Sequence, residues 1–194
     1  MRAAVFLDRD GVINRCTVDE RGVPHPPDDV GQFCYEDGAA EAVRAMKAAG
    51  FVLPVVTNQP DVARGTQTRA AVEAINAKLS RDLPVDGIFV CYHDNGDDCD
   101  CRKPKPGLLR QAAERLGIDL SASWMVGDRS GDVLAGAAVG ARTILIDRLY
   151  SKRHQCSPNF VAKDLAEAAA IILRAKSDVS DSPAPPPTAR GRAG

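Results

Sequence analysis

Short apolar runs alternate with amphipathic segments along most of the chain, and this alternation constrains the fold more than any other feature. The apolar runs have the length of buried strands and lie at residues 5–7, 51–56, 86–91, 124–126 and 142–146. The amphipathic segments carry apolar side chains at helical spacing, at residues 36–49, 68–83, 106–116, 132–139 and 162–174. Strands that alternate with helices in this way predict an α/β fold in which helices cover a parallel sheet.

The length and composition fit one domain with a short tail. The chain has 194 residues, of which 44% are hydrophobic and 26% charged, and this is enough for one sizeable core. We expect a single domain over residues 1–176. Residues 177–194 are rich in proline and poor in apolar side chains, so we expect a disordered tail there. The polar, proline-containing residues 14–30 are expected to be a loop that can fold over the end of the first strand.

Charge and hydropathy argue against macromolecular partners. The formal net charge of -1 gives no general attraction to nucleic acid or to an anionic membrane. No stretch approaches the roughly 20 consecutive apolar residues of a membrane span, and Met1 and Arg2 lead into the first strand without a signal-peptide region. We therefore expect a cytoplasmic protein that acts on a small molecule through a local site. We also expect it to be a monomer.

Polar side chains follow three of the predicted strands. Asp8 and Asp10 come after the first strand, Thr57 after the second, and Asp128 after the fourth. An Asp-x-Asp pair alone is as easily a solvated turn at a strand end. Ligands of open α/β sheets, however, bind outside the carboxyl ends of the strands, where all these side chains are expected to meet. Their coincidence at one edge of the sheet favours a functional site.

Three carboxylates, a hydroxyl and a nearby lysine are the groups that phosphoryl transfer requires. Carboxylates with water form an oxygen site that suits Mg²⁺. Together with Lys103, which lies in a basic run, that ion would neutralise an incoming phosphoryl group. One carboxylate can attack phosphorus and form an aspartyl phosphate. The second can protonate the leaving oxygen and later deprotonate the hydrolytic water.

A cluster of cysteine and histidine at residues 91–101 has the spacing of a metal site. Its candidate ligands for zinc are Cys91, His93, Cys99 and Cys101. Four such ligands so close together predict a closed tetrahedral Zn²⁺ site, because the polar loop between them has no core of its own. Buried unpaired cysteines or a regulatory disulfide are the alternatives. Zinc here would also fix the adjoining basic pair, Arg102 and Lys103.

Taken together, the motifs resemble those of the haloacid dehalogenase (HAD) phosphatase superfamily. The residues that carry this resemblance are Asp8-Arg9-Asp10-Gly11, Thr57-Asn58, Lys103 and Gly127-Asp128. Two finer motifs are similar to those of heptose-bisphosphate and histidinol phosphatases, namely Thr57-Asn58-Gln59 with Ala63-Arg64-Gly65, and Cys99-Asp100-Cys101-Arg102-Lys103-Pro104. The resemblance covers about residues 3–175 and implies a Rossmann-like HAD domain without a large cap.

The resemblance also implies roles for the catalytic residues. Asp8 would be the nucleophile and Asp10 the general acid and base. The Asp8 carboxylate, the Asp10 backbone carbonyl and Asp128 would hold Mg²⁺. Thr57 and Lys103 would hold the phosphoryl group that is transferred.

Substrate identity is the least constrained part of the resemblance. Asn58, Arg102 and Arg129 would meet the rest of the substrate, and two arginines favour a second anionic group over the cationic amine of histidinol phosphate. This chain departs from the family's pattern at Pro60-Asp61-Val62, and its gap between His93 and Cys99 is shorter than is usual in the family. A heptose-bisphosphate phosphatase, a phosphatase for another small metabolite, and a non-catalytic zinc-stapled binding module therefore all remain open. The complete set of catalytic residues argues against the binding module.

Asp132 has two interpretations from sequence. It lies three residues after Arg129, where it could support the metal from behind or stabilise the start of a helix.

Overall fold

Six strands form one parallel sheet in the computed structural model, which describes residues 1–151 and 155–180. The strands are β1 (Val5–Leu7), β4 (Pro54–Asn58), β5 (Gly87–Cys91), β6 (Trp124–Gly127), β7 (Arg142–Ile146) and β8 (Phe160–Ala162). Their order is β5-β4-β1-β6-β7-β8, and every neighbouring pair is parallel. The chain builds outward from β1 on one side and then returns to pair β6 on the other. The sheet therefore has its topological switch point at β1, where open α/β sheets bind ligands.

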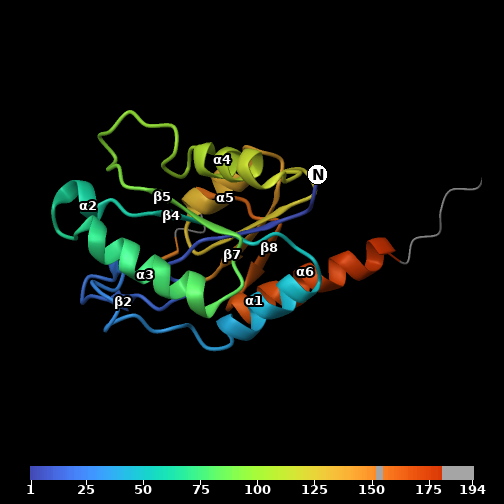
Figure 1. Cartoon of the computed structure of the whole chain (residues 1–194), viewed down its shortest axis with the longest axis horizontal. Coiled ribbons are helices and arrows are strands. Elements are labelled where there is room, and N and C mark those ends of the chain that lie inside the picture. The colour runs from blue at the N-terminus through green and yellow to red at the C-terminus, as the bar shows by residue number, and fades with distance from the viewer. Residues whose placement is uncertain (152–154, 181–194) are drawn as a thin grey trace, which may run out of the picture.

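Helices cover both faces of this sheet (Figure 1). One face carries α1 (Ala39–Ala48), α3 (Arg69–Asp82) and α6 (Leu165–Ser180), and the other carries α4 (Gly107–Leu116) and α5 (Ser130–Ala137). β1 shows why both faces need covering. Val5 and Leu7 pack in the core on the side of α1, α3 and α6, and Phe6 packs in the core on the side of α4 and α5. Successive side chains of a strand point to opposite faces, so a strand apolar at every position has to be buried on both sides.

Residues with a known preference for helix ends lie at the ends of two helices. The Thr68 hydroxyl accepts a hydrogen bond from the backbone N–H of Ala71, at 3.2 Å, and so caps α3. Gly117 ends α4 in the left-handed conformation. The expected boundaries are wrong at α5, which begins at Ser130 rather than Asp132. Asp132 lies inside the first turn of this helix and accepts a hydrogen bond from the backbone N–H of Arg129.

Other expectations about regular structure are corrected. Residues 14–30 are not a plain loop, because β2 (Thr17–Val18) and β3 (Pro24–His25) pair there as an antiparallel hairpin. A short helix, α2 (Asp61–Arg64), and the edge strand β8 had no sequence prediction. These elements are too short for hydrophobic periodicity to reveal them.

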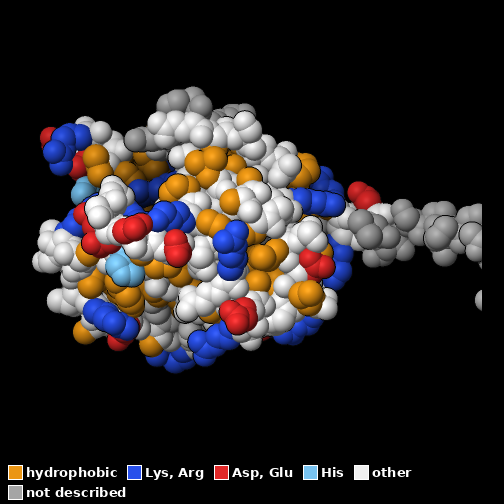
Figure 2. Space-filling model, turned by 90° about the horizontal axis from the view of Figure 1, so that it is seen from above, with side chains coloured by type: hydrophobic (Ala, Val, Ile, Leu, Met, Phe, Trp, Pro, Cys, Tyr) orange, Lys and Arg blue, Asp and Glu red, His pale blue; other side chains and the backbone are white. Residues whose placement is uncertain are grey.

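The C-terminal end of the domain also differs from the expectation. α6 continues to Ser180, so residues 177–180 of the expected tail are helical, and residues 181–194 lie outside the described residues. None of the described helices is both long and apolar enough to cross a membrane. On the face shown in Figure 2, acidic and basic side chains are interspersed.

Candidate active site

A cavity of about 600 Å³ opens at the carboxyl edge of the sheet, beside the switch point. It is lined by most of the side chains that the sequence singled out, namely Asp8, Asp10, Thr57, Asn58, Arg102, Lys103 and Arg129. Its opposite wall comes from the β2–β3 hairpin, at residues 22–26, and from α2. The hairpin thus lies over the site, where the sequence placed a covering loop.

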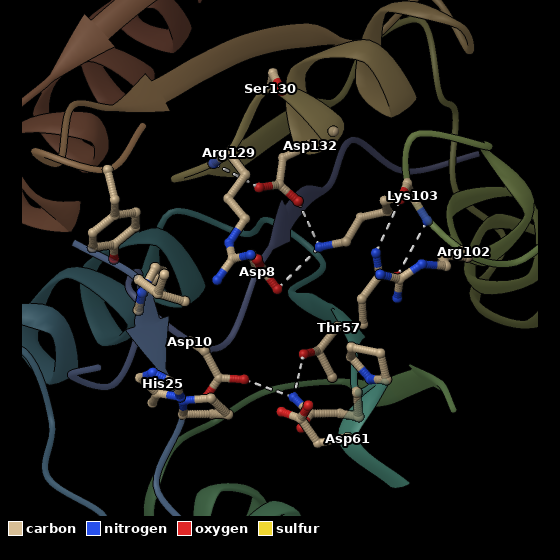
Figure 3. Close-up of a pocket in the computed structure, with 18 of the residues that line it drawn as sticks. Asp8, Asp10, His25, Thr57, Asp61, Arg102, Lys103, Arg129, Ser130 and Asp132 are labelled. Carbon is tan, nitrogen blue, oxygen red and sulfur yellow. Dashed lines mark hydrogen bonds and ion pairs between the residues drawn. The ribbon is translucent and has the colours of Figure 1, made fainter. Parts of the chain in front are cut away.

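Lys103 is the centre of the charged cluster (Figure 3). Its ammonium Nζ lies 3.0 Å from Asp8 Oδ1 and 2.6 Å from Asp132 Oδ1, and it donates a 2.7 Å hydrogen bond to the Val56 carbonyl. All three donors of the ammonium are therefore used. Burial opposes the charge of Lys103, but Asp132 and Asp8 outweigh it and raise the pKa of the amine. Lys103 is thus a fixed positive charge beside Asp8.

Asp128 follows β6, is fully buried, and has a carboxylate oxygen within 4.8 Å of one of Asp8. Burial raises the pKa of its carboxyl to about 8, and the neighbouring Asp8 and Asp132 add to this effect. Neither of its carboxylate oxygens has a hydrogen-bond partner among the described residues. The nearby Tyr150 hydroxyl acts in the opposite direction and lowers the pKa of Asp128. A buried carboxylate without a partner is costly unless a cation or a proton compensates it.

The carboxylates of Asp8, Asp128 and Asp132 could share one cation. Each offers an oxygen, and these oxygens lie within 4.8 Å of one another. Burial raises the pKa of Asp8 to about 6; Lys103 opposes this shift and Asp132 reinforces it. A set of hard oxygen donors with unsatisfied negative charge fits Mg²⁺. Asp132 is the member of this group for which the sequence left two roles open. One of its oxygens pairs with Lys103, and the other accepts a hydrogen bond from the backbone N–H of Arg129 at the start of α5.

Two glycines allow the acids to approach one another so closely. A Cβ on Gly11 would lie 2.2 Å from Asp128 Oδ2, and the φ of Gly11 is +79°, a backbone conformation that other residues rarely adopt. A Cβ on Gly127 would lie 2.1 Å from the Cβ of Asp132. Both glycines belong to the sequence motifs, and the structure gives their physical reason.

Asp10 has a different environment from the other acids. Its carboxylate accepts hydrogen bonds from Arg9 at 3.0 and 3.2 Å, from Asn14 at 2.9 Å and from Gln59 at 2.6 Å. Burial works against its charge, yet Arg9 and these hydrogen bonds prevail and lower its pKa. The Gln59 amide also donates to the Thr57 hydroxyl, at 2.9 Å. Asp10 and Thr57 are therefore held in one network.

The three side chains predicted to meet the substrate have different partners. The Asn58 amide both donates to and accepts from the Lys103 backbone, at 3.0 and 3.2 Å, so it positions the lysine. Arg102 donates to the His93 carbonyl at 3.2 Å and to the Asn95 side chain at 2.9 Å. Arg129 extends into the cavity toward Asp8 (Figure 3). With Arg64, three guanidinium groups therefore line the cavity in addition to the ammonium of Lys103.

The cysteine and histidine side chains converge at one point beside β5. Cys101 Sγ lies 3.2 Å from Cys91 Sγ and 3.3 Å from His93 Nδ1, and Cys99 Sγ lies 3.9 Å from Cys91 Sγ. All four ligand atoms lie within 4.8 Å of one another. The sulfur atoms are too far apart for a disulfide, whose S–S bond is about 2.05 Å. The donor set and its spacing fit one tetrahedral ion such as zinc.

Comparison with known proteins gives the class and then the family. Residues 100–168 match the HAD-hydrolase-like family model. A D-glycero-beta-D-manno-heptose-1,7-bisphosphate 7-phosphatase of Pasteurella multocida is 37% identical over 191 residues, which cover 91% of this chain and all of that protein. The enzyme of the same name from Escherichia coli K12 is 41% identical over 157 residues, 75% of this chain and 78% of that protein.

A solved structure gives the same result for the fold. The D,D-heptose 1,7-bisphosphate phosphatase of B. bronchiseptica, complexed with magnesium and phosphate, superposes with a TM-score of 0.77 at 32% identity, covering 89% of this chain and 99% of that one. Fold and sequence together define a HAD-type phosphatase, a phosphoric monoester hydrolase. More narrowly, the chain belongs to the family of D-glycero-beta-D-manno-heptose-1,7-bisphosphate 7-phosphatases.

Proposed function

We propose that this protein removes one phosphate from a small sugar bisphosphate, namely the 7-phosphate of D-glycero-beta-D-manno-heptose 1,7-bisphosphate. The observation that carries the proposal is the placement of positive charge in the cavity. Lys103 is buried beside Asp8, whereas Arg102 and Arg129, which line the same cavity, are more exposed to solvent. A substrate with two phosphates would match both positions, and arginine grips a phosphate by two parallel bonds.

The chemistry would proceed in two steps at Asp8. Its carboxylate attacks the phosphorus atom and the bond from phosphorus to the sugar oxygen breaks. The protonated form of Asp10, which is the minor form because Arg9 lowers its pKa, gives its proton to that leaving oxygen. Asp10 then takes a proton from water, whose oxygen attacks the aspartyl phosphate and releases phosphate. Lys103 and Thr57 would hold the phosphoryl oxygens throughout. Mg²⁺, when bound by Asp8, Asp128 and the Asp10 carbonyl, neutralises the negative charge that these groups bring together.

We also infer that the cysteine and histidine cluster holds a structural zinc ion. The loop that would carry it positions two arginines of the cavity wall. Arg102 donates to His93 and Asn95, and Arg64 forms a two-bonded ion pair with Asp94, at 2.5 and 2.9 Å. Zinc would therefore shape the substrate cavity without touching the reacting atoms.

The test of the substrate compares a bisphosphate with its monophosphate. The wild-type protein should hydrolyse heptose 1,7-bisphosphate with a kcat/KM ten- to hundredfold above that for heptose 7-phosphate, because each charge-assisted contact contributes about 1.5–3 kcal/mol. Arg102→Ala should remove most of this preference and change the monophosphate rate little. Arg115→Ala is a matched control, since Arg115 is exposed on α4 and does not line the cavity. Equal wild-type rates on the two sugars, or faster hydrolysis of histidinol phosphate, would contradict the assignment.

A further inference from the structure

The largest fully buried side chain of the described residues is a charged one, Arg9. It stands between the two acids of the Asp-x-Asp motif, and its exposed fraction is 0%. A buried guanidinium is costly unless its donors are paired. The hydrogen-bond partners of Arg9 therefore indicate the role of this buried side chain.

Arg9 grips the carboxylate of Asp10 with two parallel hydrogen bonds. Its Nε donates to Asp10 Oδ1 at 3.2 Å and its Nη2 donates to Asp10 Oδ2 at 3.0 Å. This planar fork fixes the plane of the carboxylate as well as its position. The backbone of Arg9 contributes too, because its carbonyl accepts from the N–H of Asn14, at 3.1 Å, and so holds the turn from which the Asn14 side chain reaches Asp10.

The third nitrogen of Arg9 ties this fork to a helix outside the cavity. Arg9 Nη1 donates a 2.8 Å hydrogen bond to the side-chain oxygen of Asn76, a buried residue of α3. Asn76 lies 67 residues away along the chain and does not line the cavity. Since α3 packs into the core through Ile75 and Leu79, Arg9 connects the Asp10 carboxylate to the packing of a whole helix.

We propose that Arg9 and Asn76 are positioning residues for proton transfer, which keep the Asp10 carboxylate aimed at the oxygen that leaves from phosphorus. The proposal rests on the assigned phosphatase activity and on the acid role of Asp10. Proton transfer needs heavy atoms within hydrogen-bond distance and in line, so a small rotation of the carboxylate is enough to slow it. Without Asn76, the buried Nη1 loses this acceptor, and the orientation of the Arg9 fork is less constrained.

The test uses two phosphate esters that differ in their need for a proton. The sugar alkoxide is a poor leaving group unless Asp10 protonates its oxygen, whereas p-nitrophenolate is a good leaving group without a proton. For Asn76→Ala, we expect kcat/KM to fall about tenfold on heptose 1,7-bisphosphate and less than about threefold on p-nitrophenyl phosphate. Asn76→Asp keeps an acceptor oxygen in place and should restore most of the lost rate on the sugar phosphate.

Controls separate positioning from a loss of structure. Ile75→Val is the matched variant on the same helix, and it should lower the melting temperature while leaving the ratio of the two kcat/KM values unchanged. Arg9→Lys keeps the charge but loses the fork, and it repeats the test if Asn76→Ala does not fold. An equal fall on both esters, or no fall on the sugar phosphate, would overturn the proposal. A wild-type protein inactive on both esters would overturn the assigned phosphatase activity instead.

Discussion

The two candidate metal sites of this molecule are built in opposite ways. Asp8, Asp128 and Asp132 are buried at the carboxyl ends of strands and at a helix start, and the packed sheet holds them in place. In the cysteine and histidine cluster only Cys91 is buried, at the end of β5, and the other three ligands lie on a partly exposed loop. The first site is shaped by the core, whereas the second has no core to shape it.

This difference predicts different uses for the two metals. The acids are held together against their mutual repulsion, so a cation there stabilises charge and takes part in chemistry. The loop ligands have no packed core to hold them together, so a cation there would stabilise structure. The two sites meet in the sequence, because Cys101 is followed at once by Arg102 and Lys103. Loss of a cation from either site should therefore affect the same cavity. Loss from the acidic site should lower activity most, and loss from the cysteine and histidine cluster should lower the melting temperature most.

The largest effect should separate chemistry from folding. Asp8→Asn removes the proposed nucleophile and one metal ligand but keeps the shape of the side chain, so turnover should fall at least about a thousandfold. The melting temperature and circular dichroism should match those of the wild type. Asp37→Asn, at an exposed acid outside the cavity, is the control. Phosphate release by Asp8→Asn within tenfold of wild type would exclude the aspartyl-phosphate mechanism.

The second prediction reverses this pattern. Cys99→Ser should lower the melting temperature by roughly 5–10 °C, because the loop loses a zinc ligand. Activity should fall less, about tenfold, through displacement of Arg102 and Lys103. Freshly purified wild-type protein should contain about one zinc per chain, and the variant much less. Cys34→Ser is matched to it, since Cys34 is exposed and outside the cluster. A zinc-free wild type with a cystine in this loop would refute the structural zinc site.

The smallest effect concerns pH and magnesium. Asp128 and Asp8 have pKa values raised to about 8 and about 6, from an ordinary 3.8. Without metal, the folded protein holds these protons more tightly than the unfolded chain. Their contribution to the free energy of unfolding is therefore complete below about pH 4 and is lost as the pH rises through 6 and 8. Mg²⁺ competes with these protons, so it should stabilise the protein more at higher pH.

Thermal melting with and without Mg²⁺ checks this expectation. The gain in melting temperature should rise by a few °C between about pH 5.5 and about pH 8.5. Asp128→Asn removes the unpartnered carboxylate and should abolish most of the gain. A gain that is the same at both pH values in the wild type would show that these acids are not the magnesium ligands.

Much of the candidate site could be predicted because its residues follow local patterns. Asp8, Asp10, Thr57 and Asp128 each follow an apolar run, and parallel strands bring such positions to one edge. Lys103 was found through its basic run, and the cysteine spacing marked the second cluster. Arg9 and Gln59 lay within the motifs but had no predicted role. An arginine in an acidic motif gives no sign that it will be buried, and the partner that reveals it, Asn76, is 67 residues away.

The sequence by itself determined the parallel sheet, the edge at which the acids collect and the family to which they belong. These follow from hydrophobic periodicity and from motif residues, which are properties of short segments. Only the tertiary structure decided that Asp132 pairs with Lys103 and that the Asn58 amide holds the backbone of that lysine. The physical reason is that such contacts join segments far apart in the chain, and their partners are fixed only when the helices and strands pack into one core.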